Sequence, residues 1–251
     1  MAHDSGRSGA ESHRTSDANR SDMPTPAPRS LGKIDFFSTI PPETIARLER
    51  RCRWLNLEKG DILAPAGEPL EKIFFLVSGE LRCTLYTPEG KILFLPPVTS
   101  GAIVNPETLI NPAGLIYSIA SARASTVAFV GAGTFREVLS TDPRLLQALL
   151  TTLVKREHAL IGHIEELTTL NVRERIHREL LRLCREDTNG DGSALIYPIP
   201  THEDIAHRIG THREAVSREM SHLQHVGVII RRDGALLVPE VARLKDLHLG
   251  E

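Results

Sequence analysis

The chain has 251 residues, of which 41% are hydrophobic and 25% charged; these values are typical of globular proteins, and the length fits two modest domains and a tail. A formal net charge of −2 excludes a generic polyanion binder, so any nucleic-acid contact must come from a local basic face. The sequence has neither the ~20-residue apolar run of a membrane helix nor a secretory signal, and its three cysteines are far apart: Cys52, Cys83 and Cys184. We therefore expect a cytoplasmic protein without a metal site, a disulfide framework or membrane contact.

Residues 1–30 are rich in Ser, Arg, Asp, Gly and Pro and contain almost no large apolar side chain. Such a segment cannot bury enough surface to become ordered, so we predict a disordered tail. A helix is predicted between about Ile34 and Cys52, because Pro41-Pro42-Glu43 suits a first helical turn and Ile45 and Leu48 recur on one side.

Short apolar segments run from Trp54 to about Val130 and are separated by glycine-containing turns. The turns are Lys59-Gly60-Asp61, Ala66-Gly67-Glu68, Ser78-Gly79-Glu80 and Glu89-Gly90-Lys91. Short strands with turn signals every ~8–12 residues predict an all-β sandwich or barrel. The strand pattern weakens over residues 96–117, which are rich in proline and turn residues, and returns at Ser118.

A long helix is predicted from Asp142, which suits an N-cap position and is followed by proline. Leucines recur along it every seven residues, with further apolar residues at companion positions: Leu146, Leu153, Leu160 and Leu167, with Leu149 or Leu150, Ile164 and Leu170. This spacing is typical of a coiled-coil seam and favours a parallel homodimer. The alternative is a helix packed on its own barrel. Arg156 or Glu157, and His163, interrupt the seam and are predicted at its rim.

Another helix, from Asn171 to Cys184, precedes two short helical patterns that flank Gly210. Each of the two begins with a pair that resembles a capping box: Thr201 with Asp204, and Thr211 with Glu214. Two helices joined by a tight glycine-containing turn are the signature of a helix-turn-helix.

The second of these helices has two distinct sides on a wheel drawn at about 100° per residue. Val216, Met220 and Leu223 form the side expected to be buried. The opposite arc is polar and contains Arg213, Glu214, Ser217, Arg218 and Ser221. A recognition helix presents such side chains to base edges in the major groove, where arginine pairs with guanine and glutamate accepts from cytosine. The alternative is a solvated surface helix.

Two apolar runs joined at Asp233-Gly234 lie between Val228 and Val238 and predict a β-hairpin. After a helix-turn-helix, this hairpin is interpreted as the wing of a winged helix. Arg231 and Arg232 on it would approach phosphates.

Enzyme chemistry is not supported by any motif in the sequence. His202-Glu203 with His207 resembles a zinc-protease motif, but the two histidines are five residues apart, which rotates them by about 140° from each other on a helix. The segment 187–192 resembles the opening of an EF-hand loop, yet Pro198 stands where a bidentate glutamate is required.

The segment His212-Arg213-Glu214-Ala215-Val216-Ser217-Arg218-Glu219-Met220 resembles the recognition helix of the CRP/FNR family of bacterial transcription regulators. The glycine positions in the strand region are similar to those of that family's cyclic-nucleotide-binding jelly roll. The resemblance implies an α+β protein: a tail (1–30), a jelly-roll sensor domain (31–140), a dimerisation helix (141–170) and a winged helix-turn-helix (171–251). It also implies a homodimer that binds double-stranded DNA and contacts RNA polymerase. The DNA-binding residues that we assign are Arg213, Glu214, Ser217, Arg218, Thr211, His212, Ser221, Arg231 and Arg232.

The sensor region departs from what the family uses for a cyclic nucleotide. With Arg123 aligned to the family strand, Ser118-Ile119 stands where Arg-Ser/Thr is expected, and Gly101-Ala102 replaces Gly-Glu. Leu160-Ile161 stands where polar base-contacting residues occur. A buried phosphodiester without a partner is costly, so we expect a degenerate cassette and an apolar effector pocket near Ala102, Ser118, Ile119, Arg123, Leu160 and Ile161.

The sequence leaves three possibilities for what regulates the protein: an uncharged apolar effector, haem held by His158 or His163, or no effector at all. No cofactor is predicted. A second function of another class is a ligand-binding or scaffold protein whose helix-turn-helix contacts protein instead of DNA.

Overall fold

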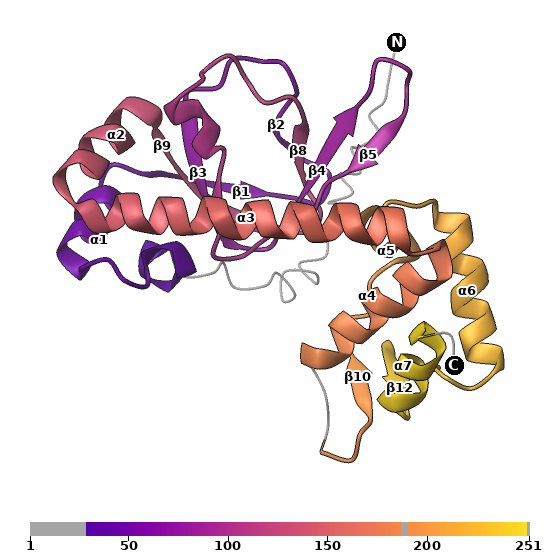
Figure 1. Ribbon diagram of the computed structural model, residues 1–251. Coiled ribbons are helices and arrows are strands. Elements are labelled where there is room, and N and C mark those ends of the chain that lie inside the picture. Colours follow the sequence, from indigo (N-terminus) through magenta and orange to yellow (C-terminus); the bar gives the residue numbers. More distant parts are fainter. Residues whose placement is uncertain (1–28, 187–189, 250–251) are drawn as a thin grey trace, which may run out of the picture.

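The computed structural model describes residues 29–186 and 190–249. Figure 1 shows an N-terminal β-sandwich, a long helix beside it, and a C-terminal group of helices with a small sheet, which confirms the predicted α+β fold. The predicted tail falls almost wholly on residues 1–28, which lie outside the described residues, as do 187–189 of the EF-hand-like segment. In the described part of the chain, no helix combines the length and apolar character needed to cross a membrane.

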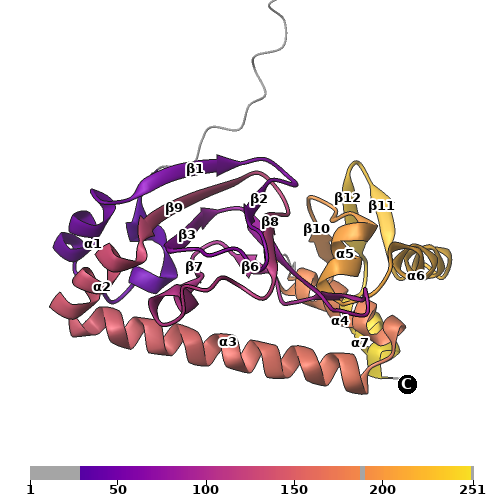
Figure 2. The same cartoon turned by 90° about the horizontal axis from the view of Figure 1, so that it is seen from above.

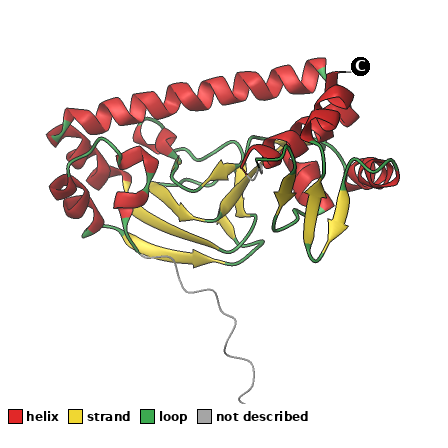
Figure 3. Cartoon of the chain, turned by 90° about the horizontal axis from the view of Figure 1, so that it is seen from below, coloured by secondary structure: helices red, strands yellow, loops and turns green. Residues whose placement is uncertain are grey.

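The N-terminal sandwich consists of two antiparallel sheets (Figure 3). One sheet has the strand order β1-β9-β3-β7, and the other has the order β2-β8-β4-β5 with β6 paired to β4. The strands are β1 (Arg53–Leu57), β2 (Ile62–Ala64), β3 (Lys72–Ser78), β4 (Glu80–Tyr86), β5 (Ile92–Phe94), β6 (Val98–Thr99), β7 (Ile103–Val104), β8 (Ser118–Ser121) and β9 (Ser125–Gly131).

Strand β3 lies at the centre of the sandwich and is buried on both faces. Because alternate side chains of a strand point to opposite sides, Phe74 and Leu76 join the core between the sheets. Ile73 and Phe75 join a second core, which lies under the helices that cover the outer face of this sheet. The continuous apolar run in the sequence therefore reflects a strand with two buried faces.

The helices over the outer face are α1 (Pro42–Glu49), α2 (Ala132–Thr141) and the start of α3, preceded by 3-10 turns η1 (Leu31–Lys33) and η2 (Asp35–Phe37). The helix predicted from Ile34 is therefore shorter than expected. It begins at Pro42, with Pro41 as its N-cap, because proline can open a helix but cannot continue one from the preceding residues.

Helix α3 (Pro143–Thr169) begins as predicted, and the Asp142 side chain accepts a hydrogen bond from the Arg144 backbone N–H at 3.1 Å. Leu145 and Leu149 are buried against the sandwich. Figure 2 shows that α3 runs from the end that carries α1 and α2 to the end that carries the C-terminal helices. It therefore runs along the sandwich and reaches the C-terminal part at its end.

The C-terminal part has one hydrophobic core, built from its four helices and two of its three strands, while the remaining strand, β11, is exposed. The elements are α4 (Val172–Glu186), β10 (Ala194–Ile196), α5 (His202–Arg208), α6 (Arg213–His225), β11 (Ile230–Arg232), β12 (Ala235–Val238) and α7 (Val241–Leu249). The predicted hairpin is confirmed: β11 pairs with β12 in antiparallel fashion. Its turn residues Asp233 and Gly234 have φ angles of 42° and 80°, as a type I′ turn requires.

The two predicted capping boxes have different outcomes. The Thr201–Asp204 capping box at the start of α5 is present. The one predicted at Thr211 is absent, because α6 begins one residue later with His212 as its N-cap and without a side-chain cap. The Thr211 backbone N–H instead donates to the Ala206 carbonyl at 2.9 Å and closes the turn after α5.

Candidate nucleic-acid interface and adjoining cavity

Helix α6 presents a polar, solvent-facing side. Arg213, Glu214, Arg218 and Ser221 are exposed, and Ser217 is half-buried between them. The opposite side is buried in the C-terminal core, as expected for Val216, Met220 and Leu223. Among the described residues, the Arg213, Glu214 and Arg218 side chains have no hydrogen-bond or ion-pair partner. They are free to meet a ligand at the start of the helix, where the helix dipole favours an anion.

The wing hairpin lies on the same side of the molecule as the start of α6. Arg231 and Arg232 of β11 are exposed. His202, the first residue of α5, has a pKa below its usual value, first because of burial and then because of the positive charges of Arg213 and Arg231. The positive charges of Arg213 and Arg231 both act on His202, and Figure 2 shows β11 beside α6, so the start of α6 and the wing are neighbours.

The remaining residues assigned to the DNA surface border it. His212 is exposed and Thr211 is half-buried in the turn before α6. The Ser221 hydroxyl donates to the Ser217 carbonyl at 2.9 Å, one turn back along the helix. The structure therefore brings all nine assigned residues to α6, the turn before it and the wing.

A buried ion-pair network holds α6 against α4, and the sequence analysis did not find it. Glu219 is 4% exposed. Its carboxylate lies 2.8 Å from His177 Nε2 and 3.1 Å from Arg173 Nε. Glu219 stands three residues after the buried Val216, so it falls on the buried side of the helix. A charged residue at such a position was the feature of the sequence that could have indicated a buried partner. Its partners lie 42 and 46 residues away, on another helix.

A cavity of about 1060 Å³ lies between the sandwich and α3. Its walls are mostly apolar and come from β4, from the segment between β5 and η3 (Pro106–Leu109), and from α3. The residues that matter to its chemistry are Cys83, Leu95, Pro97, Ala102, Glu107, Tyr117, Arg144, Lys155, Arg156 and Leu160.

The mostly apolar cavity wall also carries a polar cluster that the sequence analysis did not predict. Arg156 Nη1 lies 3.2 Å from Glu107 Oε1, and the same guanidinium donates to the Tyr117 hydroxyl. The Tyr117 hydroxyl in turn donates to Glu107 Oε1 at 3.0 Å. Arg156 was predicted at the rim of a helix seam. It faces the cavity instead, where Glu107 of η3, which is distant in the sequence, lies beside it and balances its charge.

The cavity does not offer a good axial ligand for haem. His158 and His163 are not among its lining residues, and His163 Nε2 donates to the Phe94 carbonyl at 3.0 Å. Cys83 and Tyr117 do line it, but burial raises the pKa of the thiol to about 11 and also raises that of the phenol. Both groups would have to lose a proton to bind iron. In the part of the chain that the structure describes, no group of three His, Cys, Asp or Glu residues could hold a metal ion.

The six residues assigned to an effector pocket do not form one site. Ala102 and Leu160 line the cavity. Ser118 is half-buried on β8, and Ile119 is fully buried in the core between the sheets. Arg123 is exposed and lies 3.7 Å from Glu80, while Ile161 is 57% exposed on the opposite side of α3.

Comparisons with known proteins match both parts of the chain. Residues 174–247 match a model of the Crp-like helix-turn-helix domain, and residues 54–142 match a model of the cyclic nucleotide-binding domain. A CRP-like cAMP-activated global transcriptional regulator of Mycobacterium tuberculosis is 21% identical over 215 residues, which are 85% of this chain and 96% of the relative.

Two solved structures share the fold. One is the c-di-GMP responsive global regulator CLP of Xanthomonas campestris, with a TM-score of 0.68 and 20% identity over 79% of this chain and 99% of that one. The other is a CRP/FNR family transcriptional regulator from Thermus thermophilus, with a TM-score of 0.61 and 23% identity over 78% of this chain and 98% of that one.

Proposed function

The chain belongs to the CRP/FNR family of DNA-binding transcription regulators, and from this premise we propose that it acts as a homodimer on palindromic DNA and responds to an effector other than a cyclic nucleotide. Family membership also supports RNA polymerase as a partner. The observation that carries the proposal is the exposed row of unpaired polar side chains at the start of α6, next to an exposed basic wing.

The proposed DNA contacts divide into two kinds. Arg213, Glu214, Ser217 and Arg218 lie on the first two turns of α6 and read base edges. The other contacts go to phosphates, which fix the register of the protein on DNA but carry no sequence information. We assign these to Thr211, His212, Ser221, Arg231 and Arg232.

The homodimer is supported by an apolar stripe that α3 leaves uncovered. Its members are each between 40% and 60% exposed: Leu146, Leu150, Leu153, Val154, Ile161 and Ile164. Leu153 and Val154 are adjacent; the other steps are of three or four residues once the position of Glu157 is counted, as in a coiled-coil seam. The stripe differs from the predicted leucine seam, because Leu160 faces the cavity and Ile161 takes its place.

A selection from random double-stranded DNA tests the function. We expect enrichment of a palindrome whose half-sites are about one helical turn, or ~34 Å, apart. The matched control is the full chain with both Arg213→Ala and Arg218→Ala, checked for folding by circular dichroism, which we expect to enrich nothing. If the native chain also enriches no palindrome, the helix-turn-helix is a protein-interaction module, and the proposal is wrong.

The cavity supports an uncharged, largely apolar effector with one hydrogen-bonding group near Tyr117. Three cations line the cavity, but Arg156 is paired with Glu107, and Arg144 Nε lies 2.9 Å from Asp142. Lys155, the third, is exposed on α3. A phosphodiester placed inside would therefore lack a buried counter-charge, and burying an unpaired charge is costly.

Calorimetric titration with cyclic AMP and with cyclic GMP tests this part of the proposal. We expect no heat of binding at micromolar ligand concentration from protein that still binds the selected palindrome. The DNA titration on the same sample is the control for a folded, active protein. Micromolar binding of either nucleotide would contradict the proposed effector class and would leave the DNA-binding function standing.

A further inference from the structure

Arg173, the second residue of α4, leaves most of its guanidinium unused. Its side chain is 72% exposed, and its Nε lies 3.1 Å from Glu219 Oε2. Among the described residues, its two Nη groups have no hydrogen-bond partner. A guanidinium has five N–H donors, four of them on the Nη groups, so Arg173 can still bind a ligand through a pair of parallel donors.

Glu219 holds this guanidinium from a buried position on α6. The Glu219 side chain is 5% exposed, and its other oxygen, Oε1, lies 2.8 Å from Nε2 of His177 on α4. Each carboxylate oxygen therefore has its own partner on α4, and a buried charge that loses its partners is strongly destabilising. Because Arg173 is already held at Nε, it loses less side-chain freedom when its Nη groups bind a ligand.

Helical periodicity shows from which side Arg173 approaches α6. Arg213 and Arg218 stand about 140° apart on the helix wheel and mark the two edges of the polar side. Glu219 lies about 100° further round, beyond Arg218, and so between the polar side and the core. Because Arg173 binds Glu219, it lies at the Arg218 edge of the helix.

The wing lies at the opposite edge of α6. The charges of Arg213 and Arg231 both act on His202, so the wing is near the Arg213 edge. Figure 2 shows β11 and α4 on opposite sides of α6. Exposed cations therefore flank the recognition helix on both sides, with Arg231 and Arg232 of the wing on one side and Arg173 on the other.

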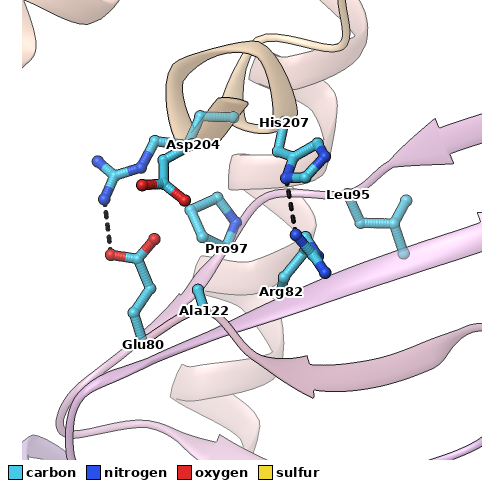
Figure 4. A pocket seen from close by; sticks show the side chains of 8 residues that line it. Glu80, Arg82, Leu95, Pro97, Ala122, Asp204 and His207 are labelled. Carbon is cyan, nitrogen blue, oxygen red and sulfur yellow. Dashed lines mark hydrogen bonds and ion pairs between the residues drawn. The ribbon is translucent and has the colours of Figure 1, made fainter. Parts of the chain in front are cut away.

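Arg208 of α5 shows how an arginine with a purely structural role is bound in this protein. Its Nη2 donates to Glu80 Oε2 of the sandwich at 2.6 Å, a contact marked by the dashed line from Glu80 in Figure 4. Its Nη1 donates to Glu179 Oε1 on α4 at 3.0 Å. Both Nη groups of Arg208 are thus occupied, whereas those of Arg173 face solvent.

The DNA backbone is the ligand that this arrangement fits. The major groove is about 12 Å wide and is bounded by one strand on each side, so a helix that lies in it has phosphates on both flanks. The fork of an arginine binds phosphate oxygens in bidentate fashion. The wing supplies cations for one strand, and Arg173 lies where the other strand passes.

We propose that Arg173 binds a DNA phosphate on the side of the major groove away from the wing, and that Glu219 and His177 hold it in position to do so. The proposal rests on the DNA-reading role proposed for α6 and adds a contact from outside the helix-turn-helix. With phosphates bound on both flanks, the depth and register of α6 in the groove are fixed.

The test is the salt dependence of binding to the selected palindrome. Each phosphate contact contributes about 0.9 to the slope of log K against log salt, and a dimer that carries Arg173→Ala loses two contacts, so its slope should fall by about 1.8. Between about 50 and about 200 mM salt, this difference amounts to roughly 12-fold in affinity. The variant should therefore bind about tenfold more weakly at the lower concentration and almost like the native chain at the higher one.

The matched control is Arg50→Ala, which removes the same charge from an exposed position at the end of α1, far from α6 (Figure 2). It should keep the native slope. Arg173→Lys retains the charge and should restore the slope that Arg173→Ala loses. Circular dichroism checks that each variant is folded, and Arg173→Gln, which keeps a hydrogen-bond donor for Glu219, replaces Arg173→Ala if the latter does not fold.

A double-mutant cycle tests the positioning role of Glu219. Glu219→Gln should weaken palindrome binding by about fivefold in the native background, because the two Arg173 side chains of the dimer must then be ordered on binding, and should leave the salt slope unchanged. In the Arg173→Ala background it should have no effect. Equal effects in both backgrounds, or tighter binding, would show that Glu219 does not act through Arg173.

A native slope for Arg173→Ala would overturn the phosphate contact. Weaker binding by the same factor at every salt concentration would also overturn it, since that result indicates a structural role alone. Lost discrimination among palindromes with single-base substitutions would mean that Arg173 contacts a base, which is again contrary to the proposal. Each of these results leaves the proposed function standing, whereas a native chain that enriches no palindrome contradicts the function itself.

Discussion

Arg218→Ala is expected to weaken binding to the selected palindrome by about 1–3 kcal/mol at each half-site. A dimer has two such sites, so the combined loss is at least about 2 kcal/mol, or roughly 30-fold in Kd. The reason is that Arg218 lies on the exposed side of α6, has no partner among the described residues, and carries the bidentate donors that recognise guanine. Titration of labelled palindromic DNA by fluorescence anisotropy measures the loss.

The same variant should also lose discrimination at one base pair in each half-site. This is measured by repeating the titration with palindromes that carry single-base substitutions. Arg136→Ala is the matched control, because it removes the same charge from an exposed position on α2, at the other end of α3 from α6 (Figure 2). If Arg218→Ala weakens specific and random DNA equally, Arg218 contacts phosphate, and the assigned base contact is wrong.

Leu150→Lys is expected to convert the dimer into a monomer. Leu150 is 55% exposed in the single chain and lies within the apolar stripe of α3. In the proposed dimer this leucine is buried, and removing it costs about 1.5–3 kcal/mol in each of the two protomers. Two ammonium groups would then also face each other across the dimer axis. The dimer Kd should therefore rise by at least about 100-fold, which analytical ultracentrifugation measures. Binding to the full palindrome should fall to the level of a half-site.

The control for this change is Ile110→Lys. Ile110 is 91% exposed and follows η3, outside the stripe, so the same substitution there should leave a dimer. A Leu150→Lys variant that remains dimeric, or a native chain that is monomeric at micromolar concentration, would contradict the α3 interface.

Features that depend on neighbouring residues could be predicted from the sequence. The start of α3 at Asp142, the capping box of Thr201 with Asp204, and the turn at Asp233-Gly234 all rest on contacts within four residues. The exposed and buried sides of α6 follow in the same way from helical periodicity. The error at Thr211 arose because the residue's backbone N–H is used to close the preceding turn, and the late start of α1 arose because proline cannot continue a helix from the preceding residues.

Features that depend on how distant segments meet could not be predicted. The Leu160 side of α3 faces the cavity instead of a partner because Leu145 and Leu149 pack on the sandwich and set the rotation of the helix. The heptad spacing is compatible with Leu160 facing either the cavity or a partner helix, so tertiary packing decides between the two.

By itself, the sequence determined the α+β order of elements, the helix-turn-helix with its wing, and the exposed polar side of α6, because periodicity, caps and turns are encoded over a few residues. Only the tertiary structure decided which polar side chains meet: Arg156 with Glu107, Glu219 with His177, and Arg208 with Glu80. These pairs are 49, 42 and 128 residues apart, and each gives a buried or half-buried polar group its hydrogen-bonding partner. Such pairing leaves no local pattern in the sequence, and it gives the cavity its polar cluster and joins α5 to the sandwich.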